Sequence, residues 1–224
     1  MTENIDSVGK QAIGYLTLKH EARERALPKS RATIRFCANS IRATHRREFQ
    51  AAEQLIGQAA ALLKEMADDL HDHQDIFFAG FVQDAQKEFA EASTFSTLTR
   101  HRPLPTADEL SIAWPAYLNG LAEAVGELRR YVLDQLRHGN FDECEIYLGY
   151  MDDIYAVLTS VDFPDAITAG LRRTTDSTRG ILEKTRGDLT AAIGQAQLQQ
   201  SMQALQAALL HHSPSGSEQG QTKK

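Results

Sequence analysis

Almost the whole chain carries the spacing of apolar residues that is typical of α-helices. Alternating β-branched or aromatic residues between turn dipeptides, which would indicate strands, are absent from the 224 residues. Apolar positions recur three and four residues apart instead, as at Tyr117, Leu121, Ala124, Leu128 and Val132. We therefore predict an all-α, single-domain bundle of about seven helices over residues 1–211. Residues 212–224 are rich in Ser, Gly, Gln and Lys, which predicts a disordered polar tail.

Proline and capping residues set the predicted helix boundaries. We expect Pro28 to follow a first helix that ends near Ala26, and to begin the next helix together with Ser30. The segment from there to about residue 70 is either one long helix or two. Further along, Thr106 and Glu109 have the spacing of a capping box.

The net charge of −6 argues against a nucleic-acid-binding protein, because such domains are usually basic. The charge is unevenly distributed, however. Residues 19–49 contain nine Lys and Arg and three acids, so they carry +6 and leave −12 on the rest. Two cysteines cannot form a disulfide framework, and no apolar run is long enough to span a membrane. These features predict a cytoplasmic protein without membrane association.

Four arginines in the basic segment share one face of a predicted helix. Their directions fall within about 60° of one another at 100° per residue, and they are Arg31, Arg35, Arg42 and Arg46. Such a ridge could contact phosphates, because the guanidinium group offers a fork of donors. It could equally be a solvated face or pair with acids of a neighbouring helix. A second, weaker basic cluster comprises Arg172, Arg173, Arg179, Lys184 and Arg186.

Acidic residues gather on three predicted helices. Glu88 and Glu91 share one face, Glu123 and Glu127 share another, and Asp142 begins a third helix that also carries Glu143 and Glu145. Carboxylates collected from several helices can hold a hard divalent cation. Glutamates at this spacing are also common on solvated helix faces, so the pattern alone leaves both interpretations open.

Several blocks resemble the translin family, which comprises translin and translin-associated factor X. Residues 30–46 are similar to the basic helix of that family, and residues 88–92 followed by Thr99-Arg100 resemble its factor X branch. The most specific blocks are Tyr117-Leu118-x-Gly120, Gly126-Glu127-Leu128-Arg129-Arg130 and Gly139-x-Phe141-Asp142. Residues 151–189 are similar to prokaryotic members. The resemblance runs in order over about residues 20–195.

The resemblance implies a fold of seven helices and a closed homo-oligomeric shell, hexameric or octameric, with a basic interior. It also implies metal-dependent endoribonuclease activity on single-stranded RNA, with single-stranded DNA as a second candidate ligand. The factor X acids match Glu88, Glu91 and Asp142, which we expect to be catalytic and to bind Mg²⁺, or Mn²⁺ in its place. A fourth family carboxylate corresponds to Ile146, so Glu145 is the substitute candidate. The alternative is a translin-like scaffold that binds nucleic acid without cleaving it.

Overall fold

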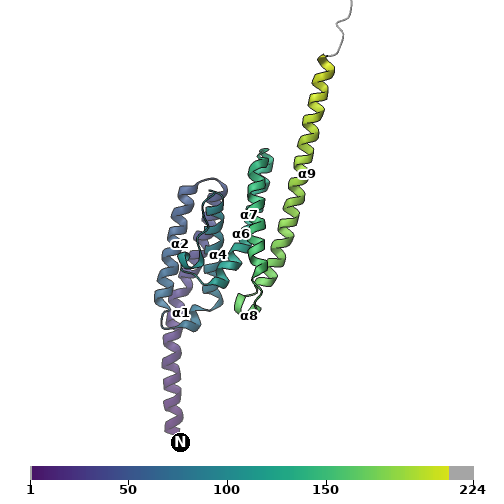
Figure 1. The fold of residues 1–224 in the computed structure, drawn as a ribbon. Coiled ribbons are helices and arrows are strands. Elements are labelled where there is room, and N and C mark those ends of the chain that lie inside the picture. The colour runs from purple at the N-terminus through teal and green to yellow at the C-terminus, as the bar shows by residue number, and fades with distance from the viewer. Residues whose placement is uncertain (1, 212–224) are drawn as a thin grey trace, which may run out of the picture.

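The computed structural model describes residues 2–211, and every regular element among them is an α-helix (Figure 1). The long helices are α1 (Thr2–His45), α2 (Phe49–Asp69), α4 (Gly80–Leu98), α6 (Trp114–Arg137), α7 (Phe141–Ser160) and α9 (Leu171–His211). Three one-turn helices lie in the connections: α3 (Gln74–Phe77), α5 (Ala107–Leu110) and α8 (Asp165–Thr168). The predicted all-α fold is confirmed. The tail predicted over residues 212–224 lies outside the described residues.

Helix α1 continues through Pro28, so the boundary predicted there is wrong. A proline inside a helix removes one backbone hydrogen bond, but the flanking turns of α1 are fixed by packing. Ala22 and Ala26 are fully buried, and the Ser30 hydroxyl donates a hydrogen bond to the backbone oxygen of Phe81 at 2.7 Å. The helix ends instead at His45, and Arg47, two residues later, has a φ of 61°, outside the helical region. The segment after Pro28 is therefore divided between α1 and α2.

Helices α1 and α4 run side by side in the same direction. Near the start of this contact Ser30 bonds to Phe81, and near its end the ring centroids of His45 and Phe95 lie 4.6 Å apart. The buried face of α1 includes Cys37 and Ile41, whereas the ridge arginines lie on a different, exposed face of the helix. The α1–α4 pair therefore fixes where the basic helix lies relative to the acids of α4.

Helix α6 is the central element, and it packs against α4, α7 and α9. Its approach to α4 is closest at Gly120. A Cβ atom at that position would lie 2.5 Å from the Ala90 side chain and 2.6 Å from the backbone oxygen of Lys87. Because glycine has no Cβ, the two backbones can meet at this point.

The short helix α5 begins with the capping box that the sequence predicts. The Thr106 side chain accepts a hydrogen bond from the Glu109 amide, and the Glu109 carboxylate accepts one from the Thr106 amide in return. This pairing satisfies two backbone donors that a helix start leaves open. It fixes the middle of the connection between α4 and α6.

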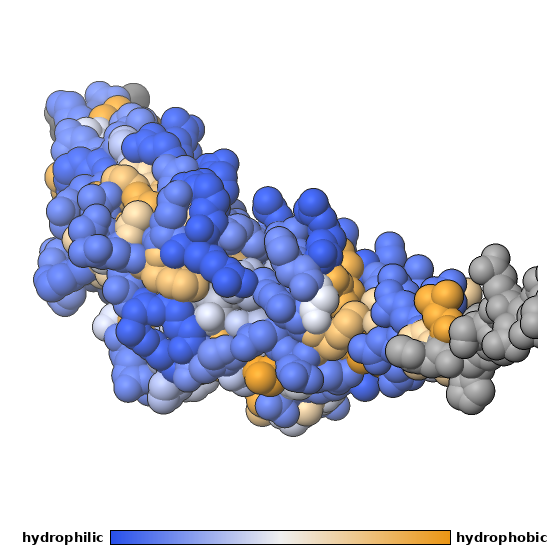
Figure 2. Space-filling view, turned by 90° about the horizontal axis from the view of Figure 1, so that it is seen from above, coloured by the Kyte–Doolittle hydropathy of each residue, from blue (hydrophilic) through white to orange (hydrophobic). Residues whose placement is uncertain are grey.

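The start of α1 and the end of α9 project from the helical body in different directions (Figure 1). Hydrophilic residues cover most of the face seen from above, and hydrophobic residues form separate patches on it (Figure 2). Within the described part of the chain, no helix combines the length and apolar character needed to cross a membrane.

Candidate metal centre and nucleic-acid interface

Three carboxylates from two helices converge where α4 crosses α6. Glu88 and Glu91 lie three residues apart on α4, and Glu123 faces them from α6. One carboxylate oxygen from each residue lies within 4.8 Å of the others, and all three residues are partly buried. We call these three residues the carboxylate group. The close approach at Gly120, one turn before Glu123, brings the two helices together here.

The surroundings of the carboxylate group disfavour its negative charge. Burial raises the pKa of Glu91 to about 8, and the charges of Glu88, Glu123 and Glu127 add to this effect. Burial also raises the pKa of Glu88, with Glu123 and Asp84 contributing. Like charges held close together in a partly buried site repel one another unless a cation lies among them.

Lys87 supplies one positive charge to this site. Its Nζ atom donates a hydrogen bond to Glu123 Oε1 at 2.8 Å. Burial acts to lower the pKa of Lys87, but the bond to Glu123 and the nearby carboxylates outweigh it and raise that pKa. One ammonium group still faces three carboxylates. The donor set is therefore all oxygen with excess negative charge, and it fits a hard divalent cation such as Mg²⁺ or Mn²⁺.

A fourth carboxylate, Glu127, lies one helical turn after Glu123 on α6. Its Oε2 atom is 2.5 Å from Nε2 of His45, whose side chain is only 6% exposed. The histidine ring in turn lies against Phe95. The buried imidazole therefore holds Glu127 in place beside the carboxylate group.

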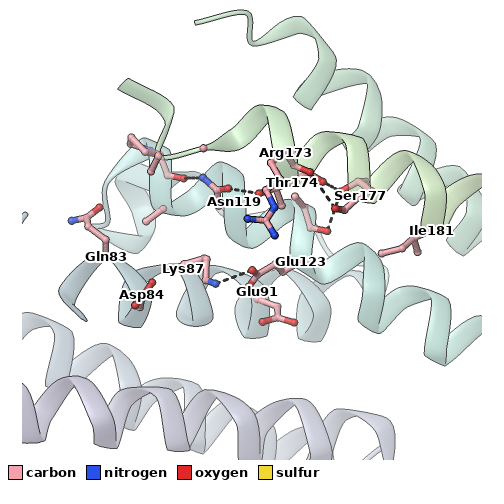
Figure 3. Close-up of a pocket in the computed structure, with 16 residues that line it drawn as sticks. Gln83, Asp84, Lys87, Glu91, Asn119, Glu123, Arg173, Thr174, Ser177 and Ile181 are labelled. Carbon is pink, nitrogen blue, oxygen red and sulfur yellow. Dashed lines mark hydrogen bonds and ion pairs between the residues drawn. The ribbon is translucent and has the colours of Figure 1, made fainter. Parts of the chain in front are cut away.

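A pocket of about 650 Å³ lies beside these acids, between α4, α6 and the start of α9. Glu91 and Glu123 line one side of it, together with Lys87, and Arg173 projects into it from α9 (Figure 3). Pockets of this size accommodate small organic ligands. Two members of the carboxylate group, Glu91 and Glu123, thus line a cavity large enough for a nucleotide.

The structure does not bring Asp142 and Glu145, the other two predicted metal ligands, into the carboxylate group. Asp142 lies in the first turn of α7, in a separate pocket formed by residues 139–143. From Glu123 to its end at Arg137, α6 advances by roughly 21 Å at 1.5 Å per residue, and α7 begins beyond that end. The missing carboxylate at Ile146 therefore does not affect the carboxylate group.

Glu123 is the residue that sequence reasoning leaves out as a ligand. The available signal is its i, i+4 spacing with Glu127, soon after Gly120. That spacing shows that the two glutamates share a helix face. It does not show that this face meets Glu88 and Glu91.

The arginine ridge is exposed along α1. Among the described residues, Arg31, Arg35 and Arg42 form no ion pair; Arg42 donates a hydrogen bond to Asn39, and Arg35 lies over the Phe36 ring. Arg46 differs, because it pairs with Glu48 through two hydrogen bonds of 2.9 and 2.7 Å. Three of the four ridge arginines thus remain available to an anionic ligand.

Comparison with known proteins identifies close relatives. The chain is 34% identical over 202 residues to an uncharacterized protein of Methanocaldococcus jannaschii, with 88% of each chain covered. Two structures of AfC3PO, one of them a complex with duplex RNA, match with TM-scores of 0.75 and 0.74. Their sequence identities are 33% and 32%, over 82% of this chain and 95% of theirs.

A more distant structure, apo-NeC3PO, shares the fold at a TM-score of 0.72 and 18% identity, over 84% of this chain and 97% of that one. No family model matches the sequence.

Proposed function

Because the chain belongs to the translin family, whose members include the C3PO proteins, we propose that it is a metal-dependent endoribonuclease that cleaves single-stranded RNA. The observation that carries this proposal is the carboxylate group, Glu88, Glu91 and Glu123, beside a pocket large enough for a nucleotide. Such an acid set supports the factor X branch of the family over a scaffold that only binds nucleic acid.

We assign metal binding to the glutamates of the site and RNA binding to the arginines of α1. Glu88, Glu91 and Glu123 would hold Mg²⁺ or Mn²⁺, with Glu127 kept beside them by His45. A divalent cation at this position supplies Lewis-acid chemistry to a phosphodiester and a source of hydroxide at neutral pH. The exposed arginines of α1 would bind the RNA backbone by charge, which requires no base recognition.

The comparison with AfC3PO supports RNA as the ligand, since that relative has been solved with duplex RNA. We propose single-stranded RNA as the substrate that is cut, with single-stranded DNA as a second candidate ligand. As in the closed shells that the family resemblance implies, we propose that the chain acts as a hexamer or octamer with its basic surface inside.

Cleavage assays with labelled single-stranded RNA, duplex RNA and single-stranded DNA test this function. We expect cuts in single-stranded RNA with Mg²⁺ or Mn²⁺ and none with EDTA. Glu91→Gln and Glu123→Gln should each lower the rate about a hundredfold or more, as loss of a charge-stabilising group in an active site does. The matched controls are Asp142→Asn and Glu145→Gln, which remove acids outside the carboxylate group and should leave the rate unchanged.

The alternative function is a scaffold that binds nucleic acid without cutting it. Salt-sensitive RNA binding with no metal-dependent cleavage would favour the scaffold. Loss of cleavage in Asp142→Asn, with full activity in Glu91→Gln, would move the catalytic site away from the carboxylate group.

A further inference from the structure

The second basic cluster of the sequence lies on α9, and its members differ in whether their charge is neutralised. Arg172 pairs with Asp162 at 3.2 Å, Arg179 with Glu183 at 2.8 Å and Arg186 with Asp152 at 2.6 Å. Arg173 and Lys184 form no ion pair with any described residue, and of these two only Arg173 lines the pocket beside the carboxylate group. Arg173 is thus an exposed, unpaired cation at an acidic site.

The backbone that carries Arg173 is fixed relative to those acids. The next residue, Thr174, donates a hydrogen bond from its hydroxyl to Asn119 Oδ1 on α6 at 2.8 Å. Asn119 also donates to the backbone oxygens of Thr168 and Pro115, at 3.0 and 2.9 Å. These bonds fix the start of α9 to α6 one turn from Glu123, while the Arg173 side chain extends into the pocket (Figure 3).

In this pocket Glu123 pairs with Lys87 and not with Arg173. Lys87 already occupies the side of Glu123 that faces the pocket, through their 2.8 Å hydrogen bond (Figure 3). A polyanion that enters this pocket meets the repulsion of its acidic lining, which comprises Asp84, Glu91 and Glu123. An unpaired guanidinium on the opposite wall offsets that repulsion, and its donors match two oxygens of one phosphate.

We propose that Arg173 binds a backbone phosphate of the RNA at the carboxylate group and holds the strand against it. This inference rests on the proposed function, and it adds a phosphate-binding residue from α9 to a site whose acids come from α4 and α6. Arg172 provides the matched control, because it is the adjacent residue with the same charge but pairs with Asp162 away from this pocket.

The test measures RNA affinity in EDTA as a function of salt, and the cleavage rate in Mg²⁺, for Arg173→Ala, Arg173→Lys and Arg172→Ala. We expect Arg173→Ala to bind RNA about tenfold more weakly, as loss of one charged hydrogen-bonding contact predicts. Its plot of log affinity against log salt should be shallower by about 0.7, the contribution of one phosphate contact to a single strand. Cleavage should fall as well. Arg173→Lys should keep the wild-type salt slope, and Arg172→Ala should match the wild type in every measurement.

Two results separate failure of this inference from failure of the proposed function. If the wild type cleaves RNA and Arg173→Ala has the same cleavage rate and the same salt slope of RNA binding, the role of Arg173 is overturned. The proposed nuclease activity is then still supported. If the wild type binds RNA without cutting it and Arg173→Ala has the shallower salt slope, the phosphate contact is supported and the proposed nuclease activity is overturned. A wild type that neither binds nor cuts RNA overturns both.

Discussion

At the scale of single residues, Lys87 is the cation that pairs with the carboxylate group. Its ammonium group is bound to Glu123, one of the three carboxylates that we propose as metal ligands. In the metal-free protein it therefore partly neutralises a site that would otherwise hold only like charges. The same position makes it an electrostatic competitor of any cation that binds there.

Lys87→Gln should bind divalent cations more tightly and be less stable without them. Removing one positive charge beside the ligands should lower the Kd for Mn²⁺ about fivefold to tenfold, since a charge interaction of about 1 kcal/mol or slightly more is lost. The metal-free variant should also have a lower Tm, because the carboxylates lose their counter-charge. Calorimetric titration with Mn²⁺ and thermal unfolding measure the two effects. Lys64→Gln, in an exposed pair with Asp68, is the control; equal or weaker Mn²⁺ binding by Lys87→Gln would contradict the expectation.

At the scale of the helices, the carboxylate group depends on the crossing of α4 and α6. Gly120→Ala should destabilise the protein by about 1–3 kcal/mol, because the added Cβ would lie 2.5 Å from Ala90 and 2.6 Å from a backbone oxygen. The control is Gly126→Ala on the same helix, where no atom lies within 4 Å of the added Cβ. That control should be neutral or stabilising, because alanine favours helix over glycine. Urea unfolding compares the free energies of unfolding of the two variants. Equal values would show that α4 and α6 can move apart at Gly120 without loss of stability.

Pro28 allows a test of what stabilises α1. It lies inside α1 and its side chain is exposed, so replacing it by alanine restores a backbone hydrogen bond and loses no packing. Pro28→Ala should therefore stabilise the protein by about 2 kcal/mol. Chemical denaturation of the variant and the wild type measures the difference. A loss of stability would mean that α1 needs a bend at this position.

Local features of the fold could be predicted from the sequence, and long-range ones could not. The helical content and the capping box at Thr106 depend on spacings within a few residues, and both are confirmed. The effect of Pro28 depends on packing against other helices, so the sequence alone gives the wrong boundary. The partnership of Glu123 with Glu91 depends on an approach between α4 and α6 that only the folded chain shows. Asp142 is an acid that could bind a metal, and the start of its helix is correctly predicted. It lies in α7, however, beyond the far end of α6.

At the scale of the whole molecule, charge is segregated along the chain. The +6 of residues 19–49 lies mainly on α1, and the remaining −12 is spread over the rest of the sequence. Net charge therefore says little about a partner that meets only one face.

This segregation predicts unequal contributions from the arginines of the ridge. Arg42→Ala should weaken RNA binding several-fold and flatten its salt dependence, since Arg42 forms no ion pair within the described chain. Arg46→Ala should have a smaller effect, because Glu48 already neutralises Arg46. Binding assays over a range of salt concentrations measure both. An equal loss in the two variants would indicate that the pair with Glu48 opens when RNA binds.

The two projecting helix ends have a consequence for the exchange of backbone amide hydrogens with solvent. The side chains of residues 4–18 and 197–210 are exposed, so each end depends chiefly on the hydrogen bonds of its own helix. Isolated helices of about this length are only marginally stable in water. In a single protomer these amides should exchange many orders of magnitude faster than those of α6, which opens only when the body unfolds. Slow deuterium uptake at either end would therefore reveal a neighbouring chain that covers it.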